Sequence, residues 1–122
     1  MLENYQKSYK NRFMVRVGDH IRSIHTEQIK LFYADGRVVY LLTDQGREYI
    51  VEYKMEELED ILDPGQYFRL NRTFMVNISA IKDVIVHSNS RLKVLLDQQF
   101  EKELIVSREK VNPFKMWFGM RD

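Results

Sequence analysis

Short apolar segments at strand spacing recur along the chain and are separated by polar turns. In the first, Phe13, Val15 and Val17 fall on one face of an extended backbone, and Gly18-Asp19 follows as a turn signal. A similar alternation, imperfect in places, predicts further strands at 20–25, from 29 to about 35, 38–43, 47–51, 81–87, 91–96 and 102–106.

The turns between these segments indicate hairpins. Asp35-Gly36 is the strongest short hairpin signal in the sequence, and Asp44-Gln45-Gly46 turns the chain again. Later turns are predicted at Ser88-Asn89-Ser90 and from Asp97 to Phe100. The alternation of strands and helices that is typical of a parallel nucleotide-binding sheet is absent from the pattern.

One segment in the middle of the chain changes to a helical period. Glu56 and Glu57 lie where acidic side chains favour a helix N-terminus, and Asp63-Pro64-Gly65 ends the helix. The apolar residues that recur at helical spacing within 54–62 are Met55, Leu58, Ile61 and Leu62.

A second, shorter helix is predicted near the C-terminus. Ser107 can cap a short helical turn, and Asn112-Pro113 is a start signal with proline at the first helical position. The predicted docking face of this helix, which ends at Gly119, consists of Phe114, Trp117 and Phe118.

A polar, basic patch interrupts an apolar segment between these two helices. The flanks, Phe68 with Leu70 and Phe74 with Val76, lie at strand spacing and can each bury one face. Residues 71–73, which read Asn-Arg-Thr, are poor residues for a strand core and good hydrogen-bond donors. The patch is therefore either a surface that meets a partner or an ordinary edge loop with a solvated arginine.

The predicted fold is mainly β, built from hairpins, with one mid-chain helix and a short C-terminal helix. The length of 122 residues fits a single domain with a substantial core. We expect residues 1–12 to be a linker or N-terminal arm, residues 13–118 to be the domain, and residues 119–122 to be a C-terminal tail.

The composition indicates the cellular compartment of the protein more clearly than its function. The chain is 44% hydrophobic and 30% charged, as in ordinary globular proteins, and has no cysteine, so disulfides and thiolate metal sites are excluded. No apolar run approaches the roughly 20 residues of a membrane helix, and the first 12 residues lack the apolar stretch of a signal peptide. We therefore expect a cytoplasmic protein.

Charge is distributed unevenly along the chain. Residues 1–65 carry 9 basic against 12 acidic side chains, whereas residues 66–122 carry 10 against 6. Much of the acid lies in residues 52–63, and the remainder of the chain has 18 basic and 12 acidic side chains. This asymmetry permits an anionic partner on one side, although a solvated acidic helix face also explains it.

No catalytic or cofactor-binding motif is present. The three histidines are scattered without metal-ligand spacing, and the five glycines do not form a phosphate-binding loop. We therefore expect neither an enzyme nor a cofactor or metal. The remaining candidates for function are loops rich in hydrogen-bond donors. Arginine and asparagine in such loops are side chains that can pair with the edges of guanine and adenine bases. The residues concerned are Arg37, Arg69, Asn71, Arg72, Thr73, Ser107, Arg108 and Lys110.

Two stretches together resemble the signatures of the LytTR DNA-binding domain. Residues 68–77, read as Phe-Arg-Leu-Asn-Arg-Thr-Phe-Met-Val-Asn and followed by Ile81, are similar to its central signature. Residues 104–108, Leu-Ile-Val-Ser-Arg, resemble its second signature, and the early strand at 29–34 and the mid-chain helix also match. The resemblance covers about residues 13–118.

The resemblance implies an elongated stack of small antiparallel sheets whose loops enter successive major grooves of double-stranded DNA. By position, the loops are the hairpin tip at 35–38, residues 71–73, and Ser107-Arg108 with the turn that follows. Arg72 and Arg108 occupy positions that contact bases in the family, and Arg37 lies near a third. Asn71 and Thr73 replace the commoner histidine and serine, which affects the preferred sequence.

The resemblance also implies partners. The family is usually the output domain of a bacterial two-component response regulator, with a receiver domain upstream, and often binds promoter DNA at tandem half-sites as a pair. Two hypotheses follow from the sequence. The first is sequence-specific DNA binding in transcription regulation. The alternative is a β-rich protein-interaction module without DNA binding.

Overall fold

The computed structural model describes residues 8–86 and 88–119. Most of the predicted N-terminal arm, most of the predicted tail and His87, the last residue of a predicted strand, lie outside the described residues. In the described part of the arm, the Lys10 N–H donates to the Ile61 carbonyl at 2.8 Å. The arm therefore contacts the end of the mid-chain helix just before the first strand begins.

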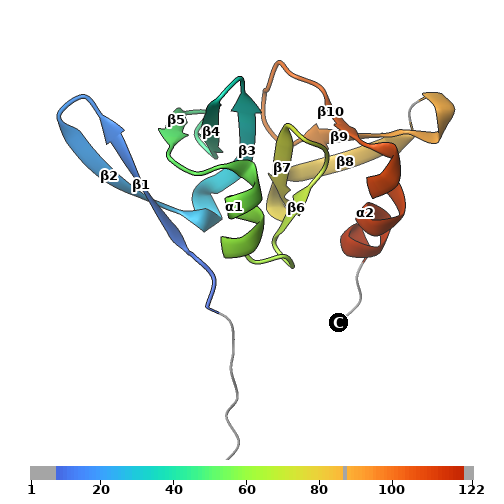
Figure 1. Ribbon diagram of the computed structural model, residues 1–122. Coiled ribbons are helices and arrows are strands. Elements are labelled where there is room, and N and C mark those ends of the chain that lie inside the picture. Colours follow the sequence, from blue (N-terminus) through green and yellow to red (C-terminus); the bar gives the residue numbers. More distant parts are fainter. Residues whose placement is uncertain (1–7, 87, 120–122) are drawn as a thin grey trace, which may run out of the picture.

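Within the described residues, ten strands form three antiparallel sheets, and the three lie in a row (Figure 1). The two-stranded sheet consists of β1 (Arg12–Val17) and β2 (His20–His25). The five-stranded central sheet has the order β5 (Glu48–Val51), β4 (Val38–Thr43), β3 (Ile29–Asp35), β7 (Phe74–Asn77) and β6 (Tyr67–Arg69). The three-stranded sheet consists of β10 (Leu104–Val106), β9 (Leu92–Leu96) and β8 (Ile81–Val86). The predicted mainly β fold with an elongated arrangement of small sheets is confirmed.

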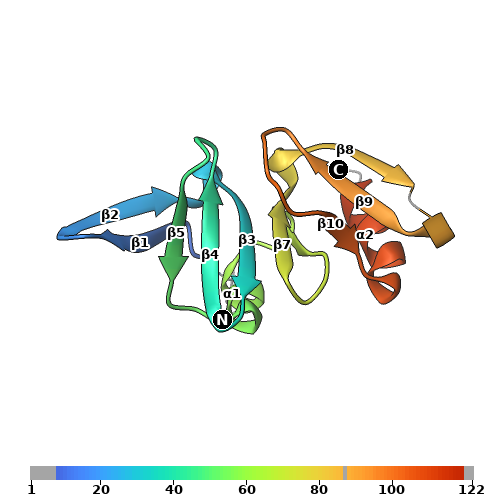
Figure 2. The same cartoon turned by 90° about the horizontal axis from the view of Figure 1, so that it is seen from above.

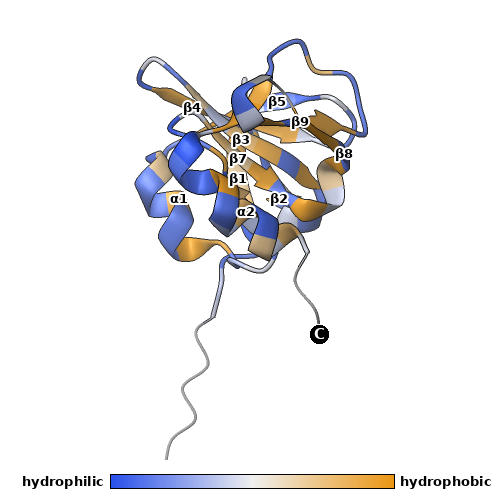
Figure 3. Ribbon diagram, turned by 90° about the vertical axis from the view of Figure 1, so that its right-hand side faces the viewer, coloured by the Kyte–Doolittle hydropathy of each residue, from blue (hydrophilic) through white to orange (hydrophobic). Residues whose placement is uncertain are grey.

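The described part of the central sheet has a hydrophobic core on each face, as the alternation along β3 shows. Leu31 and Tyr33 point into a core shared with the three-stranded sheet and the C-terminal helix. Phe32, between them, points into a core shared with β1 and the mid-chain helix. Neighbouring β7 is buried at all four positions for the same reason. Figure 3 shows these strands as largely hydrophobic beneath more hydrophilic outer segments.

The mid-chain helix forms as predicted. Helix α1 (Met55–Ile61) begins where the Glu57 side chain accepts a hydrogen bond from the Lys54 N–H at 2.7 Å. Its apolar stripe, with Leu58 fully buried, lies against the central sheet. Its acidic side faces outward.

The C-terminal helix differs from the prediction in three details. Helix α2 (Val111–Phe118) begins two residues before Pro113, which occupies the third helical position, where a missing N–H costs no intrahelical bond. Phe114 and Trp117 are buried, but Phe118 is 42% exposed and stacks on Phe114. The Ser107 side chain does not cap the 3₁₀ turn that precedes the helix.

The first hairpin of the central sheet forms at the predicted Asp35-Gly36 signal, between strands with the predicted bounds. Asp35 pairs with Val38 in the ladder, so Gly36 and Arg37 are the two turn residues. Only Gly36 has a positive φ, +63°, which is the pattern of a hairpin turn with glycine at the first central position. Arg37 therefore stands at the tip of the hairpin, and its side chain is exposed.

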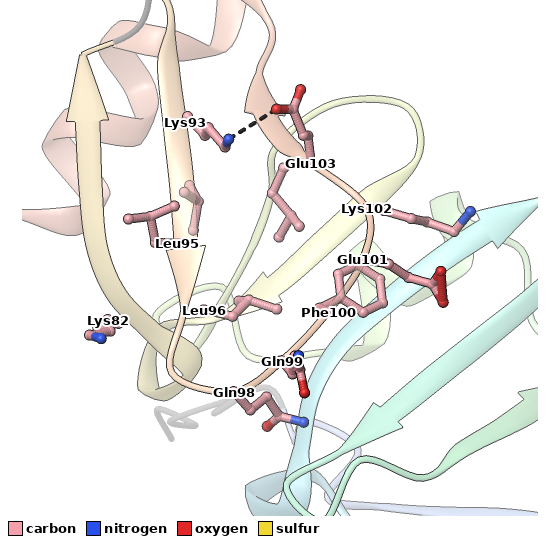
Figure 4. Close-up of a pocket in the computed structure, with 12 residues that line it drawn as sticks. Lys82, Lys93, Leu95, Leu96, Gln98, Gln99, Phe100, Glu101, Lys102 and Glu103 are labelled. Carbon is pink, nitrogen blue, oxygen red and sulfur yellow. Dashed lines mark hydrogen bonds and ion pairs between the residues drawn. The ribbon is translucent and has the colours of Figure 1, made fainter.

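The loop between β9 and β10 connects the three-stranded sheet to the central sheet. Gln98 Nε2 donates to the Thr43 carbonyl at 3.0 Å. The ring of Phe100 lies 5.5 Å from that of Tyr33, centroid to centroid, in an edge-on contact. Figure 4 shows Phe100 beneath this loop and beside β3, together with the Lys93–Glu103 ion pair that joins β9 to the loop. The loop thus fixes the two sheets relative to each other.

Among the helices of the described residues, none is long and apolar enough to span a membrane.

Candidate nucleic-acid interface

The polar patch at 71–73 forms the loop between β6 and β7, and the Asn71 side chain organises it. Asn71 Oδ1 accepts hydrogen bonds from the N–H groups of Thr73 at 2.7 Å and Phe74 at 3.0 Å. This is a local turn of the type that asparagine forms with the following backbone. Both acceptor positions of the Asn71 amide are therefore used inside the protein.

The same loop is bonded to the strand that precedes the C-terminal helix. Asn71 Nδ2 donates to the Ile105 carbonyl at 2.6 Å. In the reverse direction, the Ser107 N–H donates to the Leu70 carbonyl at 3.0 Å, and the Ser107 hydroxyl donates to the same oxygen at 3.3 Å. Ser107 therefore binds the β6–β7 loop instead of capping the turn that follows it.

A third bond connects the loop to the first hairpin of the central sheet. The Ala34 N–H donates to the Thr73 carbonyl at 2.9 Å, one residue before the end of β3. The β6–β7 loop thus lies between the tip of the β3–β4 hairpin and the end of β10. Seen from above, these three loops follow one another along the same side of the molecule (Figure 2).

Arg69 is bound differently from the other basic residues of this region. Its side chain is 13% exposed, and its guanidinium donates to the carbonyls of Asn71 and Arg72 and to the carboxylate of Glu59 in α1. A second α1 carboxylate, that of Glu56, lies 3.5 Å from Arg69 Nη1. The pKa of Glu56 is lowered, mainly by a hydrogen bond from its own backbone N–H and further by the Arg69 charge.

Within the described residues of the three loops, four cations are available to a partner. Arg37, Arg72 and Arg108 are exposed, and their side chains form no hydrogen bond or ion pair with any other described residue. Lys110 is half-buried beside them and likewise has no such side-chain partner in the described chain. Each of the three loops contributes one of these arginines. Arg108 and Lys110 both belong to the 3₁₀ turn η4 (Arg108–Lys110) that follows β10.

A groove runs between α1, the β6–β7 loop and η4. Its basic walls are formed by Arg72 and Lys110, while Glu59 and Glu109 give it an acidic side. Glu59 belongs to α1, whereas Glu109 lies next to Lys110 in η4, so an approaching phosphate is attracted to Arg72 and Lys110 and repelled from α1 and from Glu109. The full lining consists of Glu56, Glu59, Arg69, Asn71, Arg72, Thr73, Ser107, Glu109 and Lys110.

Six of the eight predicted site residues line this groove, namely Arg69, Asn71, Arg72, Thr73, Ser107 and Lys110. Arg108 is exposed in the adjoining turn η4, and Arg37 stands at the neighbouring hairpin tip. DNA contact by any of them stays a prediction. The sequence pattern places Glu59 and Glu56 on a solvated helix face, so it does not reveal their contact with Arg69, nor does it reveal the role of the Ile105 backbone carbonyl. A carbonyl carries no residue-specific signal, and the partners of Arg69 are brought near only by the packing of α1.

Comparisons with a protein-family model and with solved structures both give matches. Residues 19–119 match the model of a protein family described as the LytTr DNA-binding domain. A solved structure, described as the LytTr DNA-binding domain of a proposed methyl-accepting/DNA response regulator from Bacillus cereus, superimposes with a TM-score of 0.80. Its sequence is 19% identical, and the alignment covers 91% of this chain and 99% of that one. At this identity the likeness concerns the fold.

Proposed function

The chain belongs to the LytTR family of DNA-binding domains, and from this premise we propose that it binds double-stranded DNA in a sequence-specific manner to regulate transcription. The observation that carries the proposal is the arrangement of the three loops. Hydrogen bonds tie the β6–β7 loop to the ends of β3 and β10, and each loop holds out an arginine with no partner among the described residues.

In this proposal the loops enter successive major grooves, because the sheets lie in a row and each of the three loops presents its own exposed arginine (Figure 1). Arg72 and Arg108 read base edges, since a guanidinium pairs bidentately with guanine. Arg37 reaches a third position from the hairpin tip. Lys110 contacts phosphate, which adds affinity without sequence information.

Not all of the eight residues have the same freedom to contact DNA. The Asn71 amide and the Ser107 hydroxyl already bond within the protein, so their main contribution is to hold the loops in place. Thr73 is half-buried and belongs to the lining of the groove. We therefore assign base reading to the exposed arginines and loop geometry to Asn71 and Ser107.

We further propose that the domain serves as the output domain of a two-component response regulator, controlled by a receiver domain and acting at promoters with tandem half-sites, to which two copies bind. Support comes from the B. cereus domain of the same fold, which is described as part of a response regulator. In such a protein the cytoplasm is the expected location.

Selection of bound sequences from a pool of random duplexes tests this function. We expect enrichment of a short motif, repeated at a fixed spacing if two copies bind side by side. A pool that remains random after repeated rounds would contradict sequence-specific binding and would favour the alternative of a protein-interaction module.

A further inference from the structure

Arg69 lies at the end of β6 and directly precedes the loop that is proposed to read DNA. Its Nε donates to the Asn71 carbonyl at 3.1 Å, and its Nη2 donates to the Arg72 carbonyl at 2.7 Å. A guanidinium is planar and presents its donors in a fixed fork. Binding two neighbouring carbonyls with one fork therefore fixes the direction of the loop backbone at the two residues concerned.

The remaining edge of the guanidinium faces helix α1. Nη1 lies 2.5 Å from Glu59 Oε2 and 3.5 Å from Glu56 Oε2. The Glu59 side chain is 39% exposed and the Glu56 side chain is 74% exposed, so Glu59 is the closer and better shielded counter-ion. The contact anchors the arginine to a helix that packs into the core through Leu58.

These contacts leave Arg69 poorly suited to bind phosphate. Its side chain is 13% exposed, its charge is compensated, and an approaching phosphate would meet the α1 carboxylates first. Arg72, three residues later, is exposed and has no side-chain partner among the described residues. The two arginines of one short stretch thus have opposite environments.

We propose that Arg69 is a positioning residue for DNA recognition, and that Glu59 of α1 is the counter-ion that holds it in place. Arg69 sets the backbone of the loop from which the Arg72 side chain projects, and it makes no contact with DNA itself. This inference rests on the proposed function. It also implies that the acidic face of α1 contributes to the sequence preference by holding Arg69, in addition to repelling DNA.

The test compares four variants, Arg69→Lys, Arg69→Gln, Glu59→Gln and Asp60→Asn, with the wild-type domain. Asp60 is the matched control, because it is an exposed acid on α1 with no partner among the described residues, so its loss removes the same charge without touching Arg69. Affinities for a selected duplex and for its scrambled version are measured across a series of salt concentrations. Exchange of the Arg69 Nε–H with water is followed by NMR, and thermal melting shows whether each variant folds.

We expect Arg69→Lys and Glu59→Gln to lower the preference for the selected duplex by roughly 5- to 150-fold, the range set by the loss of one good base contact. Asp60→Asn should leave this preference unchanged, although it can raise affinity for both duplexes. Arg69→Gln should keep the wild-type salt slope, because no phosphate contact is lost. The Arg69 Nε–H should exchange faster in Glu59→Gln and at the wild-type rate in Asp60→Asn.

Several results would overturn the proposal. If Arg69→Gln reduces the salt slope by about 0.9, Arg69 contacts a phosphate. If Glu59→Gln and Asp60→Asn change binding to both duplexes by the same factor, α1 acts by repulsion alone. Should Arg69→Gln fail to fold, Arg69→Lys and Glu59→Gln still decide the question. If the wild-type domain itself does not distinguish the duplexes, the proposed function fails and this inference falls with it.

Discussion

Asn71 Nδ2 donates to the carbonyl oxygen of Ile105 at 2.6 Å, which joins two segments 34 residues apart in the sequence. Together with the bonds from Ser107 to the Leu70 carbonyl, this contact makes the β6–β7 loop and the end of β10 one unit. The relative position of the two candidate DNA-reading loops therefore depends on the Asn71 amide together with the bonds from Ser107.

Replacing Asn71 should destabilise the domain. Asn71→Ala leaves the Thr73 and Phe74 N–H groups and the Ile105 carbonyl without their partner, so we expect a loss of about 1–3 kcal/mol in the free energy of unfolding. Asn112 is an exposed asparagine, and Asn112→Ala should change stability by no more than about 0.5 kcal/mol. Urea denaturation of both variants makes the comparison, and equal effects would show that the Asn71 contacts contribute little.

The exposed arginines should differ from the neighbouring lysine in what they contribute to binding. Arg72→Ala and Arg108→Ala should each weaken binding to the selected duplex by about 1–3 kcal/mol and relax the preference at one base pair. Lys110→Ala should weaken binding to all sequences by a similar factor. Repeating the duplex selection with each variant gives the readout, and an unchanged motif for Arg72→Ala would show that its assigned role is wrong.

Asn77 should contribute strongly to stability, because it is fully buried and holds three segments together. It donates to the Ile29 carbonyl at 2.9 Å and accepts from Gln66 Nε2 at 2.6 Å and from the Ser79 N–H at 2.9 Å. Asn77→Ala should cost about 3 kcal/mol, because several buried polar groups lose their partner. Gln66→Ala removes only one of these bonds and should cost less. Thermal melting of both variants measures the two losses of stability, and a larger loss for Gln66→Ala would contradict the role of Asn77.

Stability should fall in alkaline solution because of two tyrosines. Burial raises the pKa of Tyr67 well above its ordinary value, and burial and the Glu48 carboxylate raise the pKa of Tyr33. Both side chains stay protonated in the folded state while the unfolded chain releases their protons above about pH 10. Their contribution is therefore complete below about pH 10 and declines as pH rises, by up to about 1.4 kcal/mol per pH unit for Tyr67 and by less for Tyr33, whose shift solvent screens more.

Denaturation curves at a series of alkaline pH values, paired with the tyrosinate absorbance of folded and unfolded protein, measure this effect. Tyr67→Phe should reduce the slope of stability against pH, even though it lowers stability at neutral pH by losing the bonds to Thr26 and Ile29. A slope that is the same in Tyr67→Phe and wild type would contradict the assignment to Tyr67.

Most of the fold could be predicted from local patterns. The hairpin at Asp35-Gly36 and the helix around Leu58 follow from turn residues and from helical period, which depend on neighbours in the sequence. For the last helix, the predicted start at Pro113 and the predicted burial of Phe118 were wrong. Proline is tolerated anywhere in a first turn, and an aromatic residue at the end of a short helix can remain at the surface.

The candidate site could be predicted in its members but not in their roles. Asn71, Arg69 and Arg72 all read as donors in one polar loop. The structure separates them. Asn71 donates to the Ile105 carbonyl, Arg69 donates to loop carbonyls and to Glu59 of α1, and Arg72 is exposed. These differences arise from contacts with Glu59 and Ile105, which only the folded chain brings within reach.

The most direct measurement of the central claim is a titration of the wild-type domain with a selected duplex and with its scrambled version, across a series of salt concentrations. For both duplexes, the logarithm of the binding constant should fall linearly with the logarithm of salt concentration, by about 0.9 per neutralised phosphate. At each salt concentration the selected duplex should bind roughly a thousandfold more tightly. Equal affinity for the two duplexes, or binding that does not respond to salt, would contradict DNA recognition by these loops.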